Sequence, residues 1–178
     1  MSIWRDVVAG VVGGAVAAGS MSLVHGIVAT KGAGAPPQPA LPGQPRQEDA
    51  TVKVAEGIVG GLVHGPLPEA ARPLAGNLVH YAFGASVGAL YGGVAAVAPR
   101  VTAGVGLPFG AAVWLSAHVI ATPALGLAEP PSSRPRKEEG LELVTHLVYG
   151  MVTELTRRLA RRALSPSAIL EPSQRRTP

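Results

Sequence analysis

The chain contains no cysteine, and only 15% of its 178 residues are charged. The absence of cysteine excludes disulfide bonds, cysteine-ligated zinc, iron–sulfur clusters and thiol nucleophiles. Soluble domains have about 25% charged residues, so this chain is short of the side chains that keep a surface in water. Aromatic residues are also scarce, at 4%, whereas glycine is abundant, with 23 residues. Glycine and aliphatic residues in long uncharged runs are typical of closely packed membrane helices.

Three uncharged runs are long enough to cross a bilayer. They cover residues 7–30, 73–99 and 101–128, which is 24, 27 and 28 residues. Each exceeds the roughly 20 residues that a transmembrane helix needs. The first run is longer than the apolar region of a signal peptide, which has about 7–15 residues, and polar residues such as Ser20 and His25 interrupt it. We therefore interpret it as a membrane span and not as a cleaved leader.

A fourth segment, residues 140–160, is more polar because it contains Glu142 and Glu154. We expect Glu142 to lie near one membrane surface. Glu154 lies one turn before Arg157 and Arg158, where snorkelling side chains can reach the other surface. We therefore interpret this segment as spanning too. The predicted fold is an all-α membrane bundle of four transmembrane helices, at about 7–30, 74–99, 101–127 and 140–160.

The remaining segments are loops, one short helix and a tail. Residues 31–49 form a proline- and glycine-rich outer linker. In residues 50–64, apolar side chains recur at helical spacing, which predicts a short amphipathic helix that lies on the outer surface or caps the bundle. Residues 128–139 form a second outer loop, and the basic tail at 163–178 is expected to be disordered. The four-span domain is assigned to residues 1–162.

Basic residues are concentrated near the carboxyl terminus and are not spread over one face. Six arginines stand there: Arg157, Arg158, Arg161, Arg162, Arg175 and Arg176. This distribution is typical of a membrane-flanking tail and argues against nucleic acid as a partner. Four spans place both termini on one side, and the positive-inside rule makes that side the cytoplasm. We therefore expect a multi-pass protein of a bacterial inner membrane, with the larger loops outside.

Each predicted span contains one histidine. These are His25, His80, His118 and His146, and a fifth, His64, falls in the first outer loop. At about 1.5 Å per residue, the four lie about 8–15 Å below the outer face, within the outer leaflet. Small residues accompany them on the helices, which favours close packing there and imidazoles that face the bundle interior. The predicted packing positions are Gly14, Gly84, Gly88, Gly92 and Gly150.

Three interpretations of the histidine cluster remain open. In the first, the imidazoles form hydrogen bonds with hydroxyl groups or with each other and fix the helix register. In the second, they bind a transition metal or haem, for which imidazole is a common ligand. In the third, they respond to external protons, because imidazole titrates near pH 6.5. The sequence requires no cofactor, and no predicted helix has an HxxxH or ExxH motif for a metal.

Secondary candidates are His64 and the group Glu154, Arg157 and Arg158. A carboxylate within a span is a functional candidate by default, but arginines at i+3 and i+4 favour a local ion pair near the cytoplasmic surface. The sequence contains no recognisable Ser/His/Asp catalytic motif and no phosphate-binding loop, so we predict a protein that is not an enzyme.

Of the functions left, we favour a response to external protons. The alternatives are a metal- or haem-binding membrane subunit and a structural accessory of a larger membrane complex. As partners we expect the lipid bilayer and either a second copy of the chain or a larger membrane complex. In the accessory role, the chain would pack against that complex through its glycine faces.

Three stretches of the sequence resemble a known family. HYAFGASVGALYG begins with a His–aromatic pair and ends in Tyr–Gly, HVIATPALGLAEP ends the third span, and HLVYGMVTELTRRL closes the fourth. Together they resemble the YagU-like family of small bacterial inner-membrane proteins of unknown function. The resemblance covers most of residues 7–162 and implies no reaction, substrate or cofactor. The matching positions are His80, His118, Pro123, Gly126, His146, Glu154, Arg157 and Arg158, whereas His25 has no counterpart.

Overall fold

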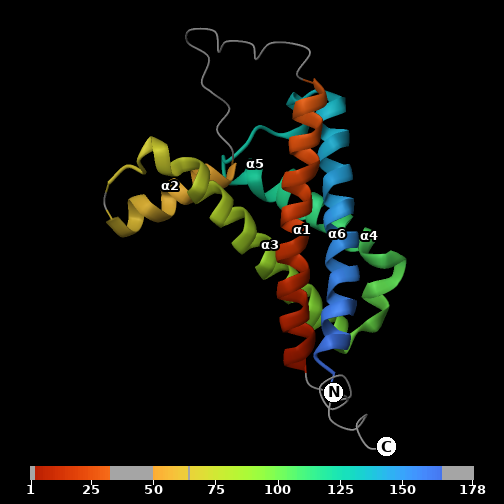
Figure 1. The fold of residues 1–178 in the computed structure, drawn as a ribbon. Helices are drawn as coiled ribbons and strands as arrows, with labels where there is room; N and C mark the ends of the chain where they lie inside the picture. The colour runs from red at the N-terminus through yellow and green to blue at the C-terminus, as the bar shows by residue number, and fades with distance from the viewer. Residues whose placement is uncertain (1–2, 33–49, 64, 166–178) are drawn as a thin grey trace, which may run out of the picture.

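The computed structural model describes residues 3–32, 50–63 and 65–165, and within these ranges it consists of helices and the turns that join them. The elements are α1 (Ile3–Gly32), α2 (Ala50–Val63), η1 (Glu69–Ala71), α3 (Arg72–Val97), η2 (Pro99–Gly106), α4 (Leu107–Val113), η3 (Trp114–Ala121), α5 (Thr122–Ala124), η4 (Pro131–Ser133) and α6 (Arg136–Ala163). The predicted all-α class is confirmed. Helices α1 and α6 lie side by side, α3 crosses α1 obliquely, and α2 packs on α3 away from α6 (Figure 1).

Three helical segments are long and apolar enough to cross a membrane: Ile3–Val28, Glu69–Val97 and Pro99–Ala124. They correspond to the first three predicted spans. Large aliphatic side chains on these segments point outward, which suits contact with lipid. The fourth predicted span, α6, is not among the three, because charged residues occupy both of its ends.

The start of α1 and the end of α6 lie at the same end of the bundle, together with η2 (Figure 1). We call this the proximal end. The end of α1 and the start of α6 lie at the opposite, distal end. Segments far apart in the sequence therefore meet at each end, and both ends bring polar side chains together.

Helices α1 and α3 touch backbone to backbone through glycines. A Cβ atom on Gly14 would collide with the carbonyl oxygen of Gly84, and one on Gly88 would collide with that of Gly10. Gly92 makes the same close approach one turn further along α3. The structure thus places four of the predicted packing glycines at one helix–helix contact, where a side chain would force the helices apart.

Helix α6 packs along α1 and against α4. Gly150, the last predicted packing glycine, faces the start of α4, where its Cβ would lie 2.7 Å from the Cα atom of Gly110. Next to it, Tyr149 is buried, and its hydroxyl donates a hydrogen bond to the carbonyl oxygen of Gly84 at 2.7 Å. This bond ties α6 to α3. The buried apolar core around it consists of Ala17, Met21, Val113 and Tyr149.

The third predicted span, residues 101–127, is not one continuous helix. Its first part, η2, contains a break at which Gly104 and Val105 have positive φ angles of 67° and 55°. Glycine adopts such angles at no steric cost, whereas they are rare for a β-branched residue such as valine. Helix α4 begins only after this break, and Pro108 lies in its first turn, where a missing N–H is tolerated. The predicted single helix at 101–127 is therefore corrected to a helical segment that is interrupted by a break near its start.

Helix α4 continues into η3, a π-helical segment that contains His118. In a π-helix each N–H donates to the carbonyl five residues earlier, and such segments are frequent at functional sites. The segment ends where Pro123, which has no N–H to donate, enters the first turn of α5. The wider turns change the direction in which the His118 side chain leaves the helix.

Candidate functional site

At the distal end, a histidine of α1 and a glutamate of α6 face each other. The Nε2–H group of His25 donates to the Oε1 atom of Glu142 at 3.1 Å. The side chains are 42% and 25% exposed, so water still reaches the pair. Because the two residues are 117 positions apart in the sequence, the bond joins two separate helices and is not a local contact.

A second pair of the same kind links η3 to the start of α6. The Nε2–H group of His118 donates to the Oε2 atom of Glu139 at 3.2 Å. The guanidinium of Arg134, in the preceding loop, lies 3.8 Å from the other oxygen of the same carboxylate. Both members of the His118–Glu139 pair are more buried than the His25–Glu142 pair. The carboxylate of Glu139 therefore contacts both a permanent cation, Arg134, and an imidazole, His118.

His146 lies close to both of these pairs. Its Nδ1–H group donates to the backbone carbonyl of Glu142 at 2.7 Å, so the neutral ring keeps Nε2 as an acceptor. The centroids of the His146 and His118 rings are 5.8 Å apart. The carboxylate of Glu142 interacts electrostatically with His25, His118 and His146. We call the set His25, His118, Glu139, Glu142 and His146 the histidine–carboxylate cluster.

His80 stands apart from this cluster. Its Nε2–H group donates to the backbone carbonyl of Ala18 at 3.2 Å, which makes it a contact between α3 and α1. Its ring meets that of Tyr81 edge-on, with centroids 5.8 Å apart. His64 lies outside the described residues. The structure therefore brings together His25, His118 and His146 of the predicted group, and it places His80 elsewhere.

Metal ligation needs several donor groups that converge on one point. Among the residues that the structure describes, no group of three or more His, Asp or Glu side chains has an arrangement that could hold a metal ion. Within the cluster, His118 and His146 bring two imidazoles together, and the carboxylate nearest to His118 is already hydrogen-bonded to it.

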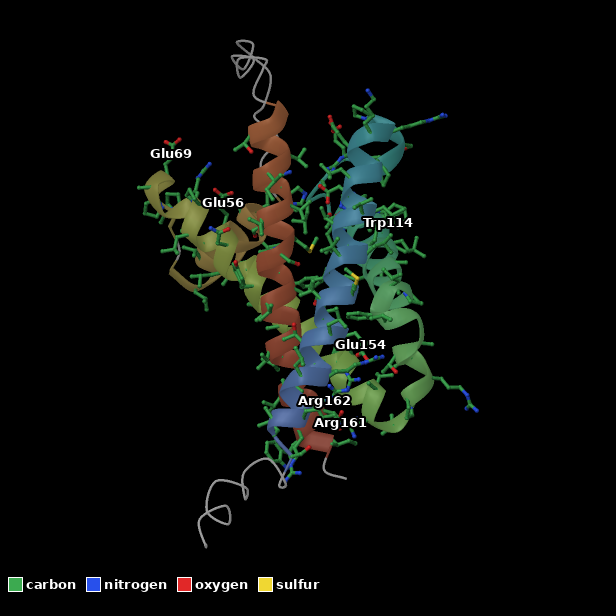
Figure 2. All side chains as sticks on the ribbon, turned by 45° about the vertical axis from the view of Figure 1, so that its right-hand side comes forward. Glu56, Glu69, Trp114, Glu154, Arg161 and Arg162 are labelled. Atoms are coloured by element: carbon green, nitrogen blue, oxygen red, sulfur yellow. The ribbon has the colours of Figure 1, made fainter. Side chains whose placement is uncertain are left out.

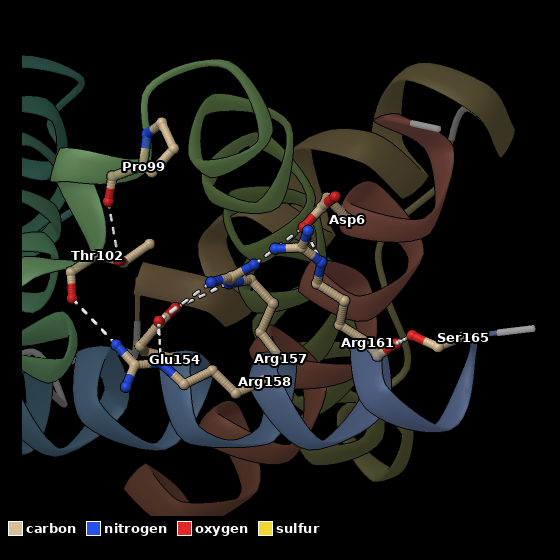
Figure 3. A network of polar contacts seen from close by, with 8 residues as sticks. All are labelled: Asp6, Pro99, Thr102, Glu154, Arg157, Arg158, Arg161 and Ser165. Atoms are coloured by element: carbon tan, nitrogen blue, oxygen red, sulfur yellow. Dashed lines mark hydrogen bonds and ion pairs between the residues drawn. The ribbon is translucent and has the colours of Figure 1, made fainter. Parts of the chain in front are cut away.

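At the proximal end, Arg157 of α6 lies between two carboxylates (Figure 3). Its Nε and Nη2 groups donate to the Glu154 carboxylate at 2.8 and 3.1 Å, and its Nη1 group donates to the Asp6 Oδ1 atom at 3.1 Å. All three side chains are buried, and Glu154 has no exposed surface. Buried charges are stable only when they are paired, and this planar fork satisfies both acidic groups.

Two further arginines extend these contacts. Arg158 donates to Glu154 and, through Nη2, to the backbone carbonyl of Thr102 in η2 at 3.3 Å. The Nε atom of Arg161 lies 3.3 Å from the Oδ1 atom of Asp6. The ring of Tyr91, on α3, lies 5.8 Å from the Arg157 guanidinium carbon. We call Asp6, Glu154, Arg157, Arg158 and Arg161 the arginine–carboxylate network; it ties α6 to α1 and to η2.

This network differs from the local ion pair that the sequence predicts for Glu154. The i+3 and i+4 pairs are present, but Glu154 is fully buried, and Asp6 from the other end of the chain completes the set. No local pattern reveals a partner 151 residues away. The predicted topology does contain a signal, because it places Asp6 at the same membrane surface as the basic end of α6.

The sequence interpretation also missed Glu139 and Glu142 as partners of the histidines. Glu142 precedes His146 by four residues and follows Glu139 by three, so the three share one helix face. This spacing is the sequence feature that could have identified the two glutamates as neighbours of His146. It shows which face of α6 is polar, but it does not show which histidines from other helices meet that face.

The family described as Protein of unknown function (DUF1440) matches residues 67–155. The chain belongs to this family. The matched region begins just before η1 and ends within α6, so it includes His80, His118, His146 and Glu154. Residues 1–66 and 156–178 lie outside it. No curated protein and no solved structure matches the chain.

Proposed function

We propose that this chain is a non-enzymatic, four-span protein of a bacterial inner membrane whose histidine–carboxylate cluster responds to protons on the outer side. The observation that carries the proposal is the pair of bonds from imidazoles of α1 and η3 to carboxylates of α6, His25 to Glu142 and His118 to Glu139. We retain the narrower YagU-like resemblance as part of the same proposal.

The burial of its charges supports α6 as the fourth span. Its 28 residues correspond to about 42 Å of helix, more than the roughly 30 Å of a hydrocarbon core. Glu154 and Arg157 lower the mean hydropathy of α6, which argues against its insertion into a membrane. Both side chains are nevertheless buried inside the bundle. Charged side chains within a membrane are tolerated when they face the bundle interior and pair with each other.

The orientation follows from the distribution of arginines. Arg157, Arg158, Arg161 and Arg162 lie at the proximal end, which also contains the start of α1. Under the positive-inside rule this end faces the cytoplasm. The distal end, and with it the histidine–carboxylate cluster, then faces the periplasm, where the pH follows that of the surroundings. In this orientation the amphipathic helix α2 lies on the outer side.

Protonation of the imidazoles would reverse the charge of the cluster. With neutral imidazoles, the carboxylates of Glu139 and Glu142 outweigh the single guanidinium of Arg134, and the cluster is net negative. With all three imidazoles charged it is net positive, and the rings of His118 and His146 repel each other at 5.8 Å. The net negative cluster attracts the first protons, and the repulsion between charged His118 and His146 then favours separation of η3 from α6 at the distal end.

This proposal is tested by the distance between η3 and α6 at the distal end, because His118 and His146 lie on these two elements. The chain has no cysteine, so spin labels can be attached at Ile120→Cys on η3 and Val144→Cys on α6, both exposed positions. In the full-length protein in nanodiscs, we expect the electron–electron distance to increase between pH 7.5 and pH 5. The triple variant His25→Gln, His118→Gln, His146→Gln should lose this response. The matched control His80→Gln, outside the cluster, should keep it.

Two results contradict the proposal. A distance that is the same at both pH values shows that protons do not move these helices. A response that persists in the triple variant shows that other groups cause it. The metal alternative is tested on the same sample, because bound haem gives visible absorption and a bound metal is detected by elemental analysis.

A further inference from the structure

The proximal end contains an open recess of about 230 Å³ that is lined almost entirely by arginine. Its lining residues are Arg157, Arg158, Arg161, Arg162 and Ser165. Typical small-molecule pockets are larger, about 300–1,000 Å³, so the recess suits a small charged group and not a whole metabolite. Figure 2 shows Arg161 and Arg162 on the last turns of α6, just beyond Glu154.

The recess has more positive than negative charge. The carboxylates of Asp6 and Glu154 neutralise two of its four arginines. Arg162 is exposed and has no acidic partner within residues 3–32, 50–63 and 65–165. Each guanidinium has five N–H donors, and the contacts described above use only some of those on Arg158 and Arg161. Donors and charge are therefore left over for an anion from outside the chain.

The surroundings of the recess are those of a membrane surface. Leu155 and Leu159, 45% and 63% exposed, precede Arg162 by seven and three residues on the same face of α6. They form an apolar strip that leads to the Arg162 guanidinium. On α1, Trp4 is 55% exposed and lies under the guanidinium of Arg5, 5.6 Å from the ring centroid. Exposed tryptophan beside arginine is typical of the headgroup level of a bilayer.

We propose that this arginine recess binds a phosphate-bearing anion, and that the headgroup of an anionic phospholipid is its source. The planar fork of arginine matches phosphate oxygens, and basic pockets between transmembrane helices bind acidic headgroups. The recess then holds the phosphate while the acyl chains lie along the apolar strip of α6. This inference requires neither the histidines nor the orientation of the chain, so it stands or fails independently of the proton response.

The test uses the full-length protein in an uncharged detergent. Thermal unfolding is followed during titration with short-chain phosphatidylglycerol, with short-chain phosphatidylcholine, and with glycerol phosphate as the soluble source of the same group. We expect phosphatidylglycerol alone to raise the melting temperature. Stabilisation by glycerol phosphate at equal concentration would support the phosphate site and identify its source as a soluble phosphate ester.

Two variants separate the recess from general surface charge. Arg162→Gln should weaken the apparent affinity for phosphatidylglycerol about fivefold, the effect of one basic residue near an acidic headgroup. Arg100→Gln removes the same charge from an exposed position in η2 at the same end, outside the recess, and should change the affinity less than twofold. Equal weakening by both variants, or no stabilisation by either phosphate compound, would overturn the proposal.

Discussion

Arg157 of α6 and Asp6 of α1 meet inside the bundle at 3.1 Å, across 151 residues of sequence. The contact fixes the first turn of the first helix to the last turns of the last helix. Its location decides its importance, because exposed ion pairs contribute about 0–1 kcal/mol, whereas breaking a buried pair costs about 3–5 kcal/mol. Here both side chains are almost completely buried. The network therefore closes the proximal end of the bundle.

Asp6→Asn keeps the shape of the side chain and removes its charge. Arg157 retains Glu154, so we expect less than the full cost of a broken buried pair, a decrease of about 2 kcal/mol in the free energy of unfolding. Unfolding of the full-length protein in mixed micelles measures the change. Glu69→Gln, at an exposed position in η1, is the control and should change stability by less than about 0.5 kcal/mol. Equal effects of the two variants would show that Asp6 contributes nothing through burial.

Arg157→Lys separates the geometry of the arginine from its charge. An ammonium group cannot make the bidentate contact to Glu154 and also reach Asp6, so two buried acceptors lose a partner. We expect a loss of about 2 kcal/mol, the range for hydrogen bonds to charged groups. The same substitution at exposed Arg162 should leave stability unchanged within the error of the measurement. A stable Arg157→Lys variant would mean that charge alone is sufficient.

The helices and their contact faces could be predicted from the sequence, because both depend on local composition. Long uncharged runs predict the first three spans, and glycines at four-residue spacing mark where α1 and α3 touch. The break at Gly104 and Val105 could not be predicted in the same way. Hydropathy averages over a turn that is itself apolar, and a positive φ is rare for a β-branched residue, so no local preference predicts it at Val105.

The positions of the histidines along their helices could be predicted from the sequence, but the rotation of each helix about its axis could not. The rise per residue places His25, His118 and His146 near one end of their helices, whatever the packing. Whether a side chain meets its neighbours depends on how each helix is rotated about its axis, and the π-helical turns around His118 alter that rotation. His80 turns to a backbone carbonyl of α1 instead. The acidic partners come from a different helix, so no spacing within one segment identifies the pairs.

Gly14→Ala tests the contact between α1 and α3. The new Cβ would collide with the Gly84 carbonyl oxygen, which belongs to backbone and cannot move alone, so the helices must separate. We expect a loss of at least about 2 kcal/mol in unfolding free energy, as for an overpacked core. Gly26→Ala on the same helix has no atom within 4 Å of the new Cβ and should be neutral or slightly stabilising. A neutral Gly14→Ala variant would contradict the close contact.

The bond between His25 and Glu142 should strengthen as the pH falls from 8 to 6. At pH 8 a neutral imidazole donates to the carboxylate, and a double-mutant cycle with His25→Gln and Glu142→Gln should give the modest coupling of about 0.6 kcal/mol typical of membrane helices. At pH 6 a larger fraction of the imidazole is charged, and charge-assisted hydrogen bonds are about twice as strong as neutral ones. The coupling should therefore increase while Glu142 stays ionised.

The matched control is the ion pair between Arg72 and Glu56, which join at 2.8 Å and are exposed to a similar degree. Arginine and glutamate as residue types titrate far from the range between pH 8 and pH 6, so the coupling energy of this pair should be the same at the two values. A coupling for His25 and Glu142 that is equally independent of pH would show that the imidazole stays neutral in its contact with α6. The cluster would then be a set of ordinary hydrogen bonds between helices. The proposed response to protons would lack the protonation of His25 on which it partly depends.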